Sequence, residues 1–292
     1  MNTYLKIAKH LTAPLAGVAA MLLLLSSCKE VGPEITLKNN QNAVADTTYV
    51  ETPQTAETKN VLVEEFTGVR CPNCPQGHQI IANIKSANPD RVISISFHPV
   101  NSLGIHYSFS KDTFQNSNAQ SLYDFMQPLG FEPVAAINRI ASTNSVLWDK
   151  NVWSSKVTAE LAQTTPVNMV LEKTYNPANR ELTIVTELHY TSDVAEKNKL
   201  TIVLSESDIE SAQLNGSVID TFYVHKDVQR AFVTAIQGDI IDAPLDAGRV
   251  VRKVYKTTLA AKWKPEHMHI VAYVHEYENR KLVYQARELK VQ

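Results

Sequence analysis

Hydrophobic and polar residues follow two different periods along this chain, and the two periods predict two kinds of domain. In the first half, hydrophobic runs predict strands, and apolar residues at helical spacing predict helices between them. The predicted elements are strand 60–66, helix 76–86, strand 91–97, helix 110–126 and strand 134–137. This alternation is typical of an α/β domain, which we place at residues 59–165.

Residues 166–292 follow the period of strands instead. Six strand-like runs are separated by turns, at 167–173, 181–190, 200–206, 250–259, 269–276 and 282–291. Alternation such as Leu182, Ile184, Thr186 and Leu188 gives each strand one buried face. The pattern predicts an antiparallel β-sandwich-like domain that begins near Pro166.

A long connection, residues 208–248, interrupts these strands. A structureless loop of that length is unusual in a compact domain, so we expect part of it to form a helix or hairpin. Within it, residues 223–230 read YVHKDVQR. They could line a ligand surface, but we interpret them as a helical turn packed on the sheet.

The N-terminus has the pattern of an export signal. Basic residues Lys6 and Lys9 precede an apolar run at 11–25, which is shorter than a membrane span. The run ends in Leu-Ser-Ser-Cys, the pattern of a bacterial lipobox, so we expect residues 1–27 to be removed and Cys28 to receive lipid. The alternative is ordinary secretory cleavage with Cys28 incidental. Polar residues 28–58 are predicted to be a disordered linker.

Composition narrows the function classes. The chain has 292 residues, 44% of them hydrophobic, and a net charge of -2, which is enough apolar content for a large core. Lysine and arginine are scattered rather than clustered, so nucleic acid is not an expected partner. We find no Gly-rich phosphate loop, nucleophile elbow or Ser-His-Asp arrangement, and we expect no cofactor.

The chain has three cysteines. If Cys28 carries lipid, Cys71 and Cys74 are the remaining thiols in an oxidising compartment, and we expect them to pair with each other. They lie where a predicted strand turns into a predicted helix. Amide groups at a helix N-terminus stabilise a thiolate. We therefore expect Cys71 to be an exposed nucleophile and Cys74 to be the resolving thiol.

The segment VLVEEFTGVRCPNC resembles the thioredoxin pattern of an apolar strand, a buried acid and a CxxC that opens a helix. The resemblance implies that Glu65 is the buried acid that moves protons. It also implies that Pro133 is a cis-proline facing the dithiol. Two features depart from the pattern: Arg70 replaces an aromatic residue, and Pro72-Asn73 replaces Gly-Pro. These changes put a transfer of thioredoxin's reducing potential in doubt.

A wider resemblance covers nearly all of the expected mature chain. The lipobox, the CPNC segment, the segment GFEPVAAINR and the late segment YVHKDVQRA together resemble the twenty-eight-kilodalton outer-membrane lipoprotein family. This implies anchoring to outer-membrane lipid through Cys28. Lys29 also favours the outer membrane, because Asp at that position commonly retains lipoproteins in the inner membrane. The membrane face, periplasmic or external, stays open.

Three hypotheses for function follow. The first is an enzyme of thiol-disulfide exchange that acts on thiols or disulfides of envelope proteins through Cys71, Cys74, Glu65 and Pro133. The second is a non-catalytic binding or adhesion lipoprotein in which the disulfide is structural. The third is copper or zinc handling, with Cys71, Cys74, His98 and His106 as the ligand set.

Overall fold

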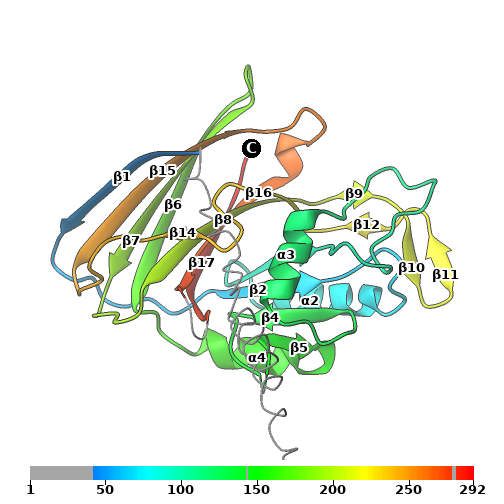
Figure 1. The fold of residues 1–292 in the computed structure, drawn as a ribbon, viewed down its shortest axis with the longest axis horizontal. Coiled ribbons are helices and arrows are strands. Elements are labelled where there is room, and N and C mark those ends of the chain that lie inside the picture. Colours follow the sequence, from blue (N-terminus) through cyan, green and yellow to red (C-terminus); the bar gives the residue numbers. More distant parts are fainter. Residues whose placement is uncertain (1–41, 143, 278–280) are drawn as a thin grey trace, which may run out of the picture. The chain divides into compact units, whose positions relative to one another are not determined.

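One long mixed sheet joins both halves of the chain (Figure 1). The computed structural model describes residues 42–142, 144–277 and 281–292, which belong to one compact unit. In spatial order the strands are β17 (Val283–Lys290), β16 (Met268–Glu276), β8 (Asn198–Glu206), β13 (Val228–Phe232), β3 (Val92–Phe97), β2 (Val61–Phe66), β4 (Val134–Ile137) and β5 (Leu147–Asp149), with β14 (Asp239–Ile240) beside β8. This sheet therefore contains strands from both sides of the boundary predicted near Pro166.

The first-half strands run in mixed directions. Strand β2 is parallel to β3 and antiparallel to β4, which in turn is antiparallel to β5. Helices α2 (Cys74–Ala87) and α4 (Trp153–Leu161) cover one face, where Ile81, Trp153 and Val157 pack on alternate residues of β2. Helix α3 (Ser117–Phe125) packs with the opposite residues of the same strand, Leu62 and Phe66. Successive residues of β2 thus point to opposite faces of the sheet and contribute to two separate hydrophobic cores.

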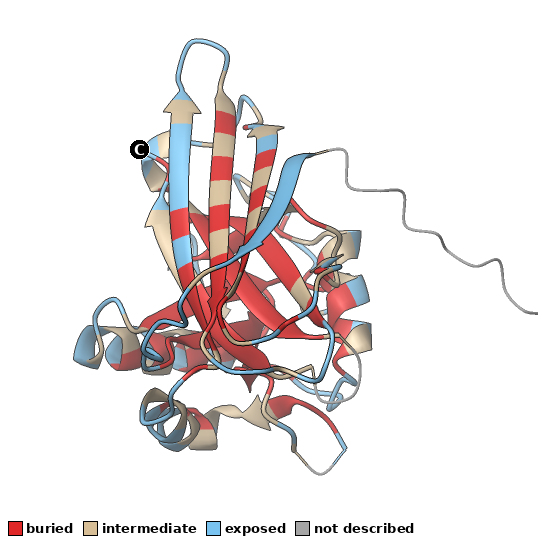
Figure 2. Ribbon diagram, turned by 90° about the vertical axis from the view of Figure 1, so that its left-hand side faces the viewer, coloured by how far each residue is buried: buried red, intermediate tan, exposed pale blue. Residues whose placement is uncertain are grey.

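A second, antiparallel sheet has the order β1 (Ala43–Val50), β15 (Arg249–Thr258), β7 (Glu181–Tyr190) and β6 (Val167–Asn176). Its inward residues, such as Leu182 and Ile184, share a core with Ile202 and Ile270 of the long sheet. Figure 2 shows buried and less buried bands alternating along β7 and β15. All six strands predicted after residue 166 are present, and their packing is sandwich-like.

Part of the predicted linker, Ala43–Val50, forms a strand. Strand β1 pairs with β15, although every residue of β1 is exposed. An edge strand held by backbone hydrogen bonds needs no apolar face, and so its sequence gives no hydrophobic period. Residues 1–41, which hold the predicted signal peptide and Cys28, lie outside the described residues. None of the helices in the described ranges is long and apolar enough to cross a membrane.

The long connection, residues 208–248, contains hairpins, which are one of the two structures that we expected there; the other was a helix. Strand β9 (Ile209–Glu210) pairs with β12 (Val224–His225), and β10 (Gln213–Asn215) pairs with β11 (Val218–Asp220). The predicted helical turn at 223–230 is wrong. Those residues form β12 and the start of β13. Strand β13 lies between β3 and β8 in the long sheet. The remaining short elements are the 3-10 turns η2 (Lys150–Val152) and η3 (Pro265–His267).

Candidate functional site

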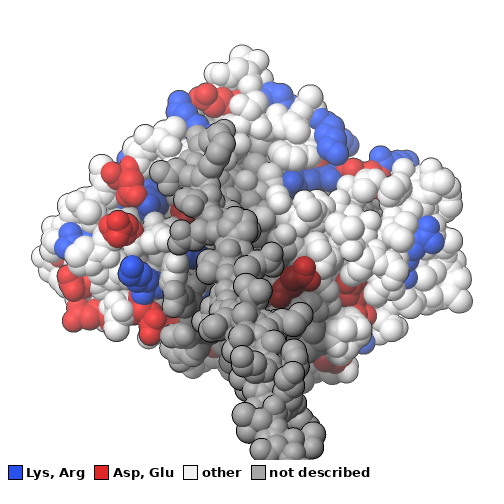
Figure 3. Space-filling model, in the orientation of Figure 1, with Lys and Arg blue, Asp and Glu red and all other residues white. Residues whose placement is uncertain are grey.

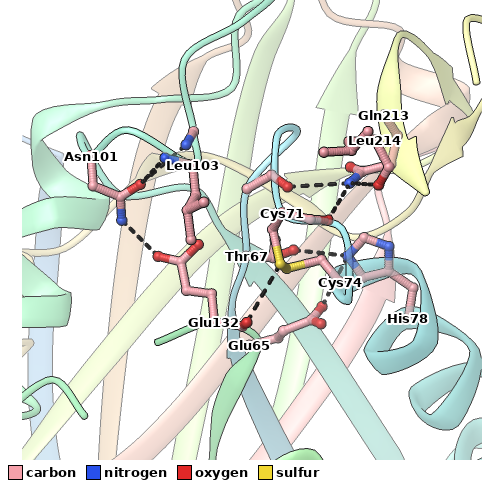
Figure 4. The surroundings of a disulfide bond; sticks show 12 residues. Glu65, Thr67, Cys71, Cys74, His78, Asn101, Leu103, Glu132, Gln213 and Leu214 are labelled. Atoms are coloured by element: carbon pink, nitrogen blue, oxygen red, sulfur yellow. Dashed lines mark hydrogen bonds and ion pairs between the residues drawn. A yellow bond between two sulfur atoms is a disulfide. The ribbon is translucent and has the colours of Figure 1, made fainter. Parts of the chain in front are cut away.

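A disulfide joins Cys71 and Cys74 at the turn between β2 and α2 (Figure 4), which confirms the predicted pairing. Cys74 is the first residue of α2, and its backbone N–H donates to the Cys71 carbonyl oxygen at 3.3 Å. The two sulfurs therefore lie at the N-terminal end of a helix, where the helix dipole favours a thiolate once the bond is reduced.

Both cysteines are buried, so the expectation that Cys71 is an exposed nucleophile is wrong for the oxidised protein. Cys71 is 1% exposed. The cover is the β10–β11 hairpin: Leu214 N–H donates to the Val69 carbonyl at 2.7 Å, and Gly216 N–H donates to the Pro72 carbonyl at 3.0 Å. The Gln213 side-chain amide also donates to the Cys71 carbonyl at 3.2 Å. This hairpin lies about 140 residues downstream, out of reach of local sequence patterns.

A loop after β3 holds the other side of the CPNC turn. Arg70 N–H donates to the Leu103 carbonyl at 2.7 Å, and a Cβ on Gly68 would lie only 2.4 Å from that oxygen. Glycine at 68 therefore permits the close approach of the loop. The Arg70 guanidinium donates to the Ile105 carbonyl at 2.6 Å and lies over the Tyr107 ring. Arg70 thus fastens this loop.

The segment before β4 reaches the disulfide as well. The Glu132–Pro133 peptide bond is cis, and the Glu132 carbonyl oxygen lies 3.5 Å from the Cys71 sulfur. The Glu132 carboxylate accepts a hydrogen bond from the Asn101 amide at 2.6 Å. Asn101 thereby connects this segment to the loop after β3.

Glu65 lies buried behind the CPNC turn, at the end of β2. Its carboxyl group accepts a hydrogen bond from the Ser96 hydroxyl at 3.2 Å, while Oε1 finds no hydrogen-bond partner among the described residues. Burial raises the pKa of Glu65 to about 8, so the group is mostly protonated at neutral pH. A Cβ on Gly77 would lie 3.0 Å from both Glu65 Oε1 and Pro133 Cγ. The fold therefore brings Glu65 and Pro133 together under the helix that begins at Cys74.

The family model described as outer membrane protein Omp28 matches residues 119–292. This chain belongs to the Omp28 family. It is accordingly an outer-membrane protein, as the sequence resemblance implied. A search of curated proteins finds no match.

Two solved structures share the fold of this Omp28-family chain. HBP35 of Porphyromonas gingivalis has a TM-score of 0.65 and 15% identity, over 82% of this chain and 77% of that one. The crystal structure of protein AGR_C_4864 from Agrobacterium tumefaciens has a TM-score of 0.50 and 12% identity, over 82% of this chain and 97% of that one. At such identities the likeness concerns fold alone.

His78 is a site residue that the sequence analysis did not single out. Its Nε2 lies 3.0 Å from the Thr67 hydroxyl and 3.7 Å from the Glu65 carboxyl group. Its Nδ1 lies 2.7 Å from the Tyr223 hydroxyl, on the segment that follows β11. Burial lowers the pKa of His78 to about 3, so the ring is neutral. The only sequence signal was its position, one turn after Cys74 in the predicted helix.

The alternative metal ligand set is not assembled. Cys71 and Cys74 are joined as a disulfide, His98 is buried against Phe114 and His225, and His106 is exposed. Within the described ranges, one group of three ligand atoms lies within 4.8 Å, and it consists of Asp227, His269 and Glu288. The Lys85 ammonium group already binds Asp227 there at 2.7 Å, which opposes a second cation.

The residue next to Glu65 faces the opposite side of β2. Glu64 forms a buried two-point ion pair with Arg139, with both N–H···O distances at 2.7 Å, and accepts a hydrogen bond from Tyr273 at 3.1 Å. This cluster ties β2 to the segment after β4 and to β16. It is a structural feature of the interior, and the sequence showed only that the two glutamates point to opposite faces.

Proposed function

We propose that this outer-membrane protein is a lipid-anchored thiol-disulfide oxidoreductase that acts on envelope proteins. In this proposal residues 59–165 are a thioredoxin-like domain, and Cys28 carries the lipid. The strand order β3-β2-β4-β5, with helices on both faces, supports the domain assignment. The CxxC disulfide at the start of α2 supports the chemistry.

The burial and the raised pKa of Glu65 are the main support for this proposal. A buried carboxyl group costs stability when one of its oxygens lacks a hydrogen bond, as Glu65 Oε1 does among the residues that the structure describes. A merely structural disulfide has no need of such a group beside it. An acid whose pKa lies near neutrality can donate and accept a proton in the same reaction cycle.

The proposed exchange has two steps. A client thiolate attacks the Cys71 sulfur, the Cys71–Cys74 bond breaks, and the Cys74 thiolate takes the proton of Glu65. A second client thiolate then attacks the client sulfur of the mixed disulfide and releases Cys71 as a thiolate. The client gains a disulfide and loses two electrons, and this protein becomes the dithiol. The reverse sequence reduces a client.

Clients reach Cys71 when the β10–β11 hairpin swings away. Exposed apolar side chains surround the site on three segments: Val100, Ile105 and Phe109; Leu129 and Phe131; and Val218, Ile219, Phe222 and Val224. The surface over β10 and β11, at the right-hand end in Figure 3, carries few charged side chains. An apolar, nearly uncharged rim suits an unfolded polypeptide segment around a client cysteine.

A trapping experiment tests this function. In Cys74→Ser the exchange should stop at the mixed disulfide with a peptide that has a single cysteine, because neither Cys74 nor a second peptide thiol can then break that bond. We expect Cys74→Ser, activated on Cys71 with a small aromatic disulfide, to form a covalent adduct with a cysteine-containing peptide. Cys71→Ser is the matched control and should form little adduct. Equal, negligible adduct in both variants would refute the exchange function.

Burial of Cys71 favours a second candidate function. A binding or adhesion protein of the outer membrane would keep the disulfide closed, as a staple between β2 and α2. In that case the hairpin would never release the sulfur. Neither cysteine variant would then trap a peptide in the folded protein.

A further inference from the structure

The Glu65 carboxyl group has almost no contact with solvent, although an acid that works in a reaction cycle must exchange protons with it. Glu65 is 1% exposed. Its Oε1 atom lies against Gly77 of α2 and has no hydrogen-bond partner among the described residues. A proton that enters or leaves this carboxyl group therefore needs neighbouring side chains to carry it.

Two side chains approach the other oxygen of Glu65, Oε2. The Ser96 hydroxyl lies 3.2 Å away and His78 Nε2 lies 3.7 Å away. Ser96 is itself buried, whereas the His78 side chain is 18% exposed. The distance of 3.7 Å is slightly longer than a hydrogen bond, and a small rotation of the His78 side chain shortens it. Hydrogen bonds that move protons are often this long in resting structures.

From His78 a hydrogen bond leads on toward the surface. The ring atom Nδ1 lies 2.7 Å from the hydroxyl of Tyr223, a partly exposed residue between β11 and β12. The Thr67 hydroxyl, 3.0 Å from Nε2, holds the ring beside Glu65 (Figure 4). His78 and Tyr223 both line a cavity of about 500 Å³, which is large enough for water.

The protonation states of the two residues suit proton transfer. Burial lowers the pKa of His78 to about 3, with His225 acting in the same direction, so the ring is neutral and has one N–H and one lone pair. Burial raises the pKa of Tyr223 to about 12, so its hydroxyl keeps its proton. A neutral ring can accept a proton at one nitrogen while it donates from the other, and no unpaired charge has to persist in the interior.

We propose that Tyr223 and His78 form a proton relay that connects Glu65 with solvent. After Glu65 has protonated Cys74, the Tyr223 O–H donates its proton to Nδ1, the Nε2–H bond breaks toward the Glu65 carboxylate, and water reprotonates Tyr223. The opposite transfer releases a proton when the dithiol is reoxidised, and it returns the ring to its first tautomer. The relay rests on the proposed function, because thiol-disulfide exchange is the reaction that would use this proton.

Deuterium exchange of the Glu65 carboxyl proton measures the relay. The oxidised full-length chain with Cys28→Ala is mixed with heavy water near pH 6, where Glu65 is protonated and ordinary carboxyl groups are ionised. Infrared spectra follow the carbonyl band of the protonated carboxyl group, which shifts when deuterium replaces the proton, and Glu65→Gln assigns this band. We expect exchange at least about tenfold faster than that of the β2 backbone amides, which exchange when the sheet opens.

Matched variants locate the path. His78→Phe keeps a ring but cannot carry a proton, and it should slow the exchange at least about tenfold, toward the rate of local opening. Tyr223→Phe removes only the outer hydroxyl and should also slow it. Ser96→Ala, which removes the other partner of Oε2, and Gln79→Ala, on the exposed face of α2, should leave it fast. A mere packing role of His78 would give the opposite sign, because looser packing speeds exchange.

The measurement needs neither a client nor a reductant, so its result does not depend on whether the protein exchanges disulfides, which the trapping experiment tests separately. Exchange in the parent that is no faster than that of the β2 amides would overturn the relay. An unchanged rate in His78→Phe or in Tyr223→Phe would overturn it as well.

Discussion

Replacing Glu65 with Gln tests whether the buried acid holds its proton to an unusually high pH. The folded protein keeps this proton up to about pH 8, whereas an unfolded chain releases it near its ordinary value of 4.5. Unfolding therefore releases a proton in this window, and stability falls as pH rises through it. The loss attributable to Glu65 amounts to about 3 kcal/mol at pH 7 and about 4 kcal/mol at pH 8.

Gln has nearly the same shape and does not titrate, so Glu65→Gln should lack this loss. We expect the variant and the parent to have similar unfolding free energies near pH 4.5 and to diverge steadily above it, with the variant more stable. Urea unfolding of the oxidised protein between pH 4.5 and 8 measures the difference. Glu172→Gln, on the exposed part of β6, is the control and should show no divergence. A constant difference between Glu65→Gln and the parent across this range would refute the reasoning.

Two further predictions concern the other face of β2 and the cover of the disulfide. Glu64→Gln leaves Arg139 buried without its ion-pair partner and should destabilise the protein by about 3 to 5 kcal/mol in urea unfolding at pH 7; a loss under about 1 kcal/mol would show that the pair is solvated. Gln213→Leu removes two hydrogen bonds that hold the hairpin over the CPNC turn, and at about 1 kcal/mol each it should speed reduction by dithiothreitol by about 30-fold. Ser217→Ala, in the exposed turn of that hairpin, should not change the rate, and an unchanged rate in Gln213→Leu would contradict the role of the hairpin as a cover.

Local patterns were sufficient for most strands and helices. Strands with one buried face, such as β7, have an apolar residue at every second position, and α2 has its isoleucines at helical spacing. A strand with no face against a core has no such alternation of apolar residues. Every residue of β1 is exposed, and the sequence therefore predicted a linker there. The place of β13 in the long sheet leaves no local signal for a related reason: β13 pairs with β3, which is far from it in sequence, as well as with β8.

The candidate site could be predicted only in part. The pair of Cys71 and Cys74 and the choice of Glu65 and Pro133 follow from short motifs, and the structure brings these four residues to one place. Burial of Cys71 depends on Gln213 and its neighbours, and the setting of His78 depends on Tyr223. Contacts between segments about 140 residues apart leave no local signal, because no period or motif in either segment specifies its distant partner.

The reduction potential of the Cys71–Cys74 couple tests the central claim most directly. Equilibration of the folded protein in graded thiol-disulfide buffers, followed by thiol alkylation and mass measurement, gives this value. An exchange enzyme should have a potential between about -270 and -120 mV, the range of catalytic dithiols. A potential below about -300 mV is typical of structural disulfides and would contradict the proposed function.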